Sequence, residues 1–293
     1  MRVAAIGFLN PAPLMWDFEH APLNEALAKR YIVDHMTPAE CAARLADGRA
    51  DIGLIPIASL ATTPGLRILP GCTIASKGKV RSLILAHRAG LSPGKLRSVA
   101  ADSASRTTLV YARMMFHKWG NAQVPFLPMV ADLDAMLEQA DAAILIGDPA
   151  LLALEERNNQ FERTGEELVY LDLAEEWRKL TGLAFVSAVW AVAPNVGTQS
   201  MQAAAVARRS ELDESVTRDF VLSRDHGLAN IDALVAEWSK RFPIPEQTIR
   251  TYLTANIHYV LDDECVEGMR GFFGIAAELG ILPKYELVMG SSQ

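Results

Sequence analysis

Short apolar runs alternate with helix-like segments along the first half of this chain, and this alternation limits the fold more than any other feature. Arg2 to Leu9 is predicted as a buried strand, Pro22 to Arg30 as a helix, and Ile52 to Ile55 as a second buried strand. Thr37-Pro38-Ala39-Glu40 contains a capping box with proline at the first helical position, and Gly48 ends the helix that follows. Strands and helices in this order predict an α/β fold with parallel sheets and right-handed crossovers.

The alternation breaks around Arg88 to Lys95, where glycine and proline gather, and a second series of strands and helices then begins. Leu183 to Val192 is a continuous run typical of a long strand. From about Ser200 to Leu282 the pattern is helical, without a convincing strand. This order predicts two lobes joined by two crossings of the chain, with the helical tail packing back on the first lobe.

We therefore expect an α/β protein with two lobes, each a mainly parallel sheet flanked by helices. Residues 1–88 and 190–293 are predicted to form the first lobe, and residues 89–189 the second. Ligands bind at the carboxyl ends of strands in such sheets, so the cleft between the lobes is the predicted ligand site.

The charge of the chain limits which partners it can bind. The 35 acidic and 28 basic residues give a formal net charge of −7. This balance argues against nucleic acid and membrane surfaces as partners, and it leaves room for a small anion held by a few donors in a cleft. No apolar run approaches the roughly 18 residues of a membrane helix. Asn10-Pro11 interrupts the first apolar run too early for a secretory signal, so we expect a cytoplasmic protein.

The cysteines and the missing motifs indicate chemistry without a metal or cofactor. Cys41, Cys72 and Cys265 are odd in number and widely spaced, which favours three buried thiols over a disulfide framework or a zinc site. The six histidines show no metal-ligand spacing. The sequence also lacks a dinucleotide-binding glycine motif, a P-loop and a nucleophile elbow.

Polar residues gather where predicted strands end and helices begin. Asn10 follows the first strand, and its amide either faces the cleft or simply turns the chain. The segment from Asp102 to Thr108 opens a helix with several hydroxyls. That arrangement suits a bound carboxylate and equally suits helix capping by Ser105.

Two further segments are candidates with open alternatives. Ser76 to Ser82 places three cations around a glycine turn, which either meets an anion or is a solvated turn. Ser82 stands in an apolar strand, so its hydroxyl is expected to have a specific partner. Asp148, between Gly147 and Pro149, either faces the cleft or caps the helix that follows.

The order of these segments provides a more specific signal than any one of them. The runs are Leu9-Asn10-x-x-Pro13-Leu14, Gly48-x-x-Asp51-x-Gly53-Leu54-Ile55-Pro56, Ile74-Ala75-Ser76-x-Gly78-x-Val80-x-Ser82, Asp102-x-x-Ser105-Arg106-Thr107-Thr108, Ile146-Gly147-Asp148-x-Ala150-Leu151 and Trp177-x-x-x-Thr181-Gly182-Leu183-x-Phe185-Val186. Together they resemble the chorismate dehydratases of the futalosine route to menaquinone, which have the fold of type II periplasmic binding proteins. Departures from the family pattern occur at Thr108, Ala184 and Ser187, where the family usually has serine, proline and often an aromatic residue.

The resemblance implies a lyase that removes water from chorismate to give 3-[(1-carboxyvinyl)oxy]benzoate, without metal or cofactor. It implies catalytic roles for Asn10 and Ser82, which would contact one carboxylate or orient the ring. The hydroxyl-rich helix start would clamp the other carboxylate of this small dicarboxylate. The substrate-binding residues that it implies are Ser105, Arg106, Thr107, Thr108, Gly147, Asp148 and Gly182. No residue stands out as the general base.

Two other functions are compatible with the same pattern. One is a non-catalytic anion-binding protein of the same fold, because fold alone does not decide function. The other is the related dihydroxynaphthoate synthase of the same pathway, whose characteristic Ser-Pro-rich opening is absent here.

Overall fold

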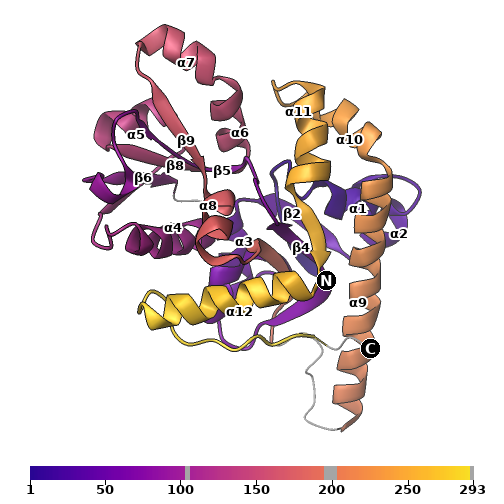
Figure 1. The fold of residues 1–293 in the computed structure, drawn as a ribbon. Helices are drawn as coiled ribbons and strands as arrows, with labels where there is room; N and C mark the ends of the chain where they lie inside the picture. The colour runs from indigo at the N-terminus through magenta and orange to yellow at the C-terminus, as the bar shows by residue number, and fades with distance from the viewer. Residues whose placement is uncertain (103–105, 195–202, 291–293) are drawn as a thin grey trace.

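The computed structural model describes residues 1–102, 106–194 and 203–290, which form two α/β lobes side by side (Figure 1). The first sheet has the order β11-β4-β10-β3-β1-β2 and the second β7-β6-β8-β5-β9. The strands of the first sheet are β1 (Arg2–Ile6), β2 (Ile32–Met36), β3 (Ile52–Pro56), β4 (Arg67–Ser76), β10 (Phe185–Val192) and β11 (His258–Leu261). Those of the second are β5 (Leu83–Arg88), β6 (Val99–Asp102), β7 (Phe126–Met129), β8 (Ala142–Ile146) and β9 (Leu168–Asp172).

Helices cover both sheets, and the helices after β10 flank the first lobe in Figure 1. Those of the first half are α1 (Trp16–Glu19), α2 (Asn24–Ala28), α3 (Pro38–Ala46), α4 (Arg106–Lys118) and α5 (Leu133–Gln139). Then come α6 (Gly147–Glu155), α7 (Arg157–Thr164), α8 (Leu173–Thr181), α9 (Ala203–Ala229), α10 (Ile231–Trp238), α11 (Glu246–Thr251) and α12 (Asp263–Glu278). Short 3-10 helices span Ala12–Met15, Ile57–Ala61 and Pro93–Lys95, and a π-helix spans Tyr252–Asn256.

The predicted capping box is confirmed at the start of α3. Thr37 accepts a hydrogen bond from the Glu40 amide, and the Glu40 carboxylate accepts one from the Thr37 amide at 2.9 Å. The three cysteines are buried and free, as the sequence predicts. The tail also packs back on the first lobe, because the Ile68 amide donates to the Val288 carbonyl at 2.9 Å.

The two-lobed α/β class is confirmed, but both sheets are mixed rather than mainly parallel. Parallel pairing joins β1 to β2 and β3, and β6 to β7 and β8. Antiparallel pairing joins β10 to β3 and β4, β4 to β11, and β5 to β8 and β9. The strands β5 and β10, which follow the crossings between lobes, run against their neighbours and make each sheet mixed.

The same two strands place the crossings several residues earlier than the sequence predicts. β5 pairs within the second sheet, although the division at residue 88 puts it in the first lobe. β10 lies between β3 and β4 of the first sheet, although most of it falls in the range 89–189. A fully buried apolar strand shows no polar face, so its sequence does not tell which sheet it joins. The helical pattern of the tail also conceals β11, a strand of only four residues.

A continuous apolar core runs from the first lobe into one face of the second sheet, and a smaller cluster fills the other face of that sheet. The largest fully buried side chains include Trp177, Trp190, Tyr111 and Tyr252. The helices within the described ranges lack the combination of length and apolar character that crossing a bilayer demands.

Candidate active site

A cavity between the lobes collects several of the predicted site residues. Asn10 from the first lobe, Ser82 before β5, Thr108 in the first turn of α4 and Gly147 at the start of α6 all line it. Its volume is about 40 Å³, enough for a few waters. Among the described residues, its lining contains no charged side chain. An anion there would meet neutral donors and the positive ends of two helices.

Asn10 reaches the cavity because the chain turns sharply after β1. The Ala12 amide donates to the Leu9 carbonyl at 3.1 Å, and the 3-10 helix Ala12–Met15 begins directly after Pro11. The Oδ1 atom of Asn10 is buried and has no hydrogen-bond partner among the described residues. The sequence pattern left open whether this side chain only turns the chain, and its position in the cavity wall favours contact with a ligand.

Ser82 is positioned by a left-handed turn in the first crossing. Arg81 has φ +64°, a conformation that costs a non-glycine residue about 1–2 kcal/mol. The Asp172 carboxylate holds this turn, because its Oδ2 accepts the Val80 amide at 3.0 Å and the Arg81 amide at 2.7 Å. Its Oδ1 accepts the Ala174 and Glu175 amides at the start of α8. One partly buried carboxylate therefore ties the crossing to the second lobe beside Ser82.

Residues at the start of α6 contact both the first crossing and the first lobe. The Gly147 amide donates to the Ser82 carbonyl at 2.7 Å, and the Leu9 amide donates to Asp148 Oδ1 at 3.0 Å. Burial raises the pKa of the Asp148 carboxyl to about 6, and the hydrogen bond from Leu9 opposes this shift. The Phe8 ring packs so closely on Gly147 that a Cβ atom at position 147 would lie 2.7 Å from it.

The residues at the start of α4 have different surroundings. Thr108 lines the cavity, while the Thr107 hydroxyl accepts a hydrogen bond from the Ala58 amide of the first lobe at 3.1 Å. Arg106 is exposed, and Ser105 lies outside the described residues. Gly182 ends α8 in a left-handed conformation and is not among the described residues that line the cavity.

Cations of the Ser76–Ser82 segment form ion pairs with carboxylates of the protein itself. Lys77 Nζ lies 2.6 Å from Asp262 and 2.9 Å from Glu264, and Arg81 pairs with Glu155 at 2.7 Å. Of the two interpretations of this segment, the structural one therefore fits Lys77 and Arg81, and Ser82 is its residue at the cavity.

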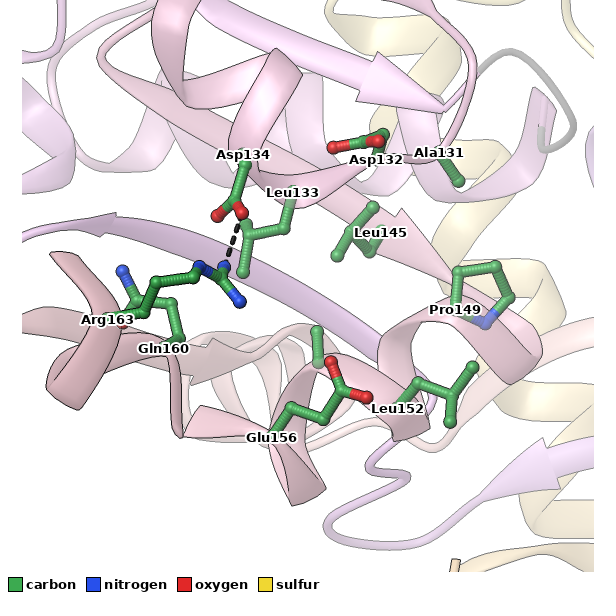
Figure 2. A pocket seen from close by; sticks show the side chains of 11 residues that line it. Ala131, Asp132, Leu133, Asp134, Leu145, Pro149, Leu152, Glu156, Gln160 and Arg163 are labelled. Atoms are coloured by element: carbon green, nitrogen blue, oxygen red, sulfur yellow. Dashed lines mark hydrogen bonds and ion pairs between the residues drawn. The ribbon is translucent and has the colours of Figure 1, made fainter. Parts of the chain in front are cut away.

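A second hollow, of about 360 Å³, lies on the second lobe among α5, α6 and α7 (Figure 2). An ion pair between Arg163 and Asp134 spans part of it, and Asp132 is engaged as the N-cap of α5. The described residues that line it include none of those that line the cavity between the lobes. It is therefore a separate feature of the second lobe.

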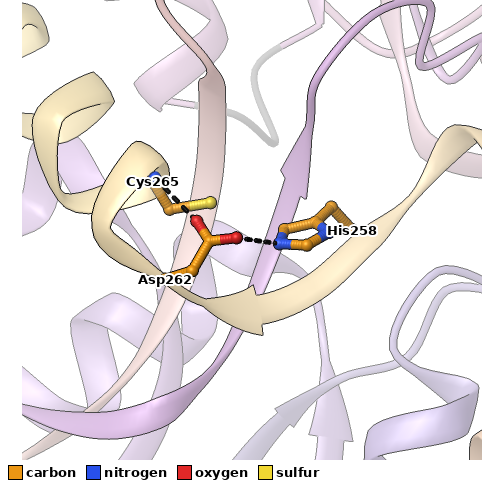
Figure 3. Close-up of side chains that lie close together, drawn as sticks. All are labelled: His258, Asp262 and Cys265. Atoms are coloured by element: carbon orange, nitrogen blue, oxygen red, sulfur yellow. Dashed lines mark hydrogen bonds and ion pairs between the residues drawn. The ribbon is translucent and has the colours of Figure 1, made fainter.

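His258, Asp262 and Cys265 form a cluster of three groups that are potential metal ligands (Figure 3). Asp262 caps α12 by accepting the Cys265 amide at 3.0 Å, and its Oδ2 atom already contacts His258 and Lys77. Burial, with the nearby Asp262 charge, raises the pKa of the Cys265 thiol to about 12, so the thiol stays protonated near neutral pH. These contacts indicate a helix cap with an ion-pair network.

Two α/β lobes with a cavity at their boundary define a class, the proteins with the periplasmic-binding-protein fold. Solved structures of this kind superpose over almost the whole chain. A protein from Archaeoglobus fulgidus gives a TM-score of 0.69 at 13% identity, covering 96% of this chain and 98% of its own. The aliphatic sulphonate binding protein SsuA from Escherichia coli gives 0.62 at 13% identity, covering 100% and 94%.

Sequence comparison places the chain more narrowly. The chain belongs to the menaquinone biosynthesis family, whose model matches residues 1–278. A chorismate dehydratase from Thermus thermophilus is 25% identical over 263 residues, covering 86% of this chain and 89% of that protein. Both findings support an enzyme of menaquinone biosynthesis with a small-molecule substrate.

Proposed function

We propose that this protein is a chorismate dehydratase, a lyase that converts chorismate to 3-[(1-carboxyvinyl)oxy]benzoate and water. The observation that carries the proposal is the meeting of Asn10, Ser82, Thr108 and Gly147 at one cavity, although they come from four separate segments. The family match and the Thermus thermophilus relative support the same reaction.

The reaction needs positioning and charge stabilisation more than a reactive side chain. The C–H bond at the ring carbon bearing the enolpyruvyl ether breaks, and its electron pair delocalises toward the ring carboxylate. Hydroxide then leaves the neighbouring carbon, takes up a proton and departs as water, and the ring becomes aromatic. Asn10 and Ser82 would donate to the developing charge, because fixed donors in a site that excludes water stabilise it strongly.

The start of α4 would hold a substrate carboxylate, with Thr108 at the cavity and Ser105 and Arg106 beside it in sequence. Thr107 would support this clamp indirectly, because its hydroxyl is bonded to Ala58 of the first lobe. Gly147 and Asp148 would place the start of α6 against the substrate. Among the described residues, no ionisable side chain lines the cavity. We therefore assign the proton from the ring carbon to a carboxylate of the substrate itself.

Incubation of the purified protein with chorismate tests the proposal, with the aromatic product followed by absorbance and mass spectrometry. Asn10→Ala and Ser82→Ala should each lower kcat by an amount equivalent to about 2–4 kcal/mol, the value of an oxyanion-hole donor. Ser239→Ala is a matched control, because its hydroxyl bonds to the Ala236 carbonyl at the end of α10. If the protein binds chorismate but forms no aromatic product, the proposed enzyme function is wrong and a binding function takes its place. If both alanine variants keep full turnover, the active site does not lie at this cavity.

A further inference from the structure

Tyr252 is a fully buried tyrosine whose hydroxyl interacts with the side chains of the two proposed donors, Asn10 and Ser82. It follows Ser82 by 170 residues in the chain. It begins the π-helix Tyr252–Asn256, a rare element often found at functional sites. The other end of this π-helix contacts the first crossing, because Asn256 Nδ2 donates to the Lys79 carbonyl at 3.1 Å. The π-helix therefore lies against the segment that carries Ser82.

The Tyr252 hydroxyl interacts electrostatically with the Ser82 and Asn10 side chains, and with the Asp148 charge. None of these contacts reaches hydrogen-bond geometry, so the hydroxyl has no hydrogen-bond partner among the described residues, and neither does Asn10 Oδ1. Burial raises the pKa of the Tyr252 phenol, against opposing interactions with Ser82 and Asn10, so the phenol stays protonated and can donate. A buried donor and a buried acceptor thus stand near each other, both unsatisfied.

Leaving two such groups unsatisfied destabilises a fold, so their retention calls for a functional explanation. A small shift of either side chain on ligand binding would let the phenol donate to Asn10 Oδ1. That bond would turn the amide nitrogen of Asn10 toward the cavity as a donor. Without it, the amide is free to rotate and present its oxygen to the anionic substrate.

We propose that Tyr252 is a positioning residue that fixes the orientation of the Asn10 amide so that its N–H group faces the substrate. The inference rests on the proposed dehydratase function and adds a residue to it. Tyr252 does not line the cavity itself, so its effect passes through Asn10.

The test compares Tyr252→Phe with Tyr259→Phe, using chorismate as substrate. Tyr259 is a matched control, because its hydroxyl is also buried and lacks a hydrogen-bond partner among the described residues, and neither Asn10 nor Ser82 affects its pKa. Tyr252→Phe should lower kcat about tenfold with KM changed less than about twofold, because the lost orientation matters most in the transition state. Tyr259→Phe should keep kcat within about twofold of the wild type. The Tm of Tyr252→Phe should equal or exceed that of the wild type, because an unsatisfied hydroxyl is removed.

A double variant shows whether the effect passes through Asn10. Asn10→Ala with Tyr252→Phe should turn over no more slowly than Asn10→Ala alone. Additive losses, full turnover in Tyr252→Phe, or an equal loss in Tyr259→Phe would overturn the inference and leave the dehydratase function standing. A wild-type protein that forms no aromatic product would overturn the proposed function and this inference with it.

Discussion

At the scale of single residues, Asp148 joins the two lobes through one carboxylate. It lies in the first turn of the second lobe's helix α6, where it does not act as the N-cap, accepts the Leu9 amide of the first lobe, and is largely buried. A carboxyl group buried in this way binds its proton more tightly in the folded chain than in the unfolded chain. The contact between the lobes is therefore linked to pH.

Asp148→Asn should raise the free energy of unfolding at pH 7–8 and leave it unchanged below about pH 4. The pKa of about 6, against the ordinary value of 3.8, corresponds to up to about 3 kcal/mol of folding free energy lost when the carboxyl ionises. The wild type loses this stability as pH rises through about 4 to 6, while the amide keeps an oxygen for the Leu9 N–H. Urea unfolding of both proteins at several pH values measures the difference. A gap that does not depend on pH would contradict the assigned environment of Asp148.

Gly147 and Gly182 form a natural pair for testing the contact with Phe8. Both have positive φ, +60° and +75°, but an added Cβ meets the Phe8 ring only at position 147, and position 182 is open. Each glycine-to-alanine change should cost about 1–2 kcal/mol from backbone strain alone. Gly147→Ala should in addition lower turnover, because it displaces Phe8 at the cavity. Urea unfolding and chorismate turnover separate the two effects, and equal turnover in both variants would show that the Phe8 contact is dispensable.

The sequence predicts part of the candidate site and misses the rest for identifiable reasons. Asn10, Ser82, Thr108 and Gly147 follow from strand ends, helix starts and the ordered family pattern. Tyr252 carries no local signal, because a tyrosine in a helical tail is indistinguishable from a core residue until the tail is folded against the first crossing.

At the scale of elements, the first crossing depends on side chains that lie far along the chain. Asp172, at the end of β9, accepts four backbone amides, two from the crossing and two from the start of α8. β9 itself was not predicted from the sequence, and neither was its role in fixing the turn at Arg81. The local pattern predicts a strand that includes Ser82, but the strand begins one residue later at Leu83, and the pattern gives no sign of what orients Ser82 in the crossing.

Asp172→Ala should destabilise the protein by about 2–4 kcal/mol, because it removes a helix cap and leaves buried amides at the crossing unsatisfied. It should also lower turnover, since Ser82 adjoins the released turn. Asp132→Ala is the matched control, an N-cap that accepts the Ala135 amide of α5 at 3.0 Å, away from the cavity. That change should cost about 1 kcal/mol and leave turnover intact. Thermal unfolding measures the loss of stability, and kcat measures the loss of turnover. Equal losses of stability and turnover in the two variants would argue against a special role for the crossing.

At the scale of the whole molecule, the lobes enclose a smaller cavity than a substrate needs. About 40 Å³ is well below the roughly 300 Å³ of typical ligand pockets, so binding requires the lobes to part. Two crossings of the chain are a structural basis for hinge motion of this kind.

Small-angle X-ray scattering should therefore detect lobe motion. The ligand-free protein is expected to have a larger radius of gyration than the closed structure described above. Saturating aromatic product should reduce the radius of gyration of the protein. The Gly182→Ala variant should respond as the wild type does. Identical profiles with and without product would contradict a hinge that takes part in binding.

The position of β10 between β3 and β4 has a consequence for the order of biosynthesis. The ribosome releases the N-terminal strands first, but the central strand of their sheet is translated only after the entire second lobe. Until Val192 has emerged, β3 and β4 have open edges on the sides that β10 later fills, and such edges are prone to pairing with other chains. The second sheet, by contrast, is complete once β9 has been made. A nascent chain of this protein is thus expected to acquire its inserted lobe before the lobe that contains its N-terminal strand.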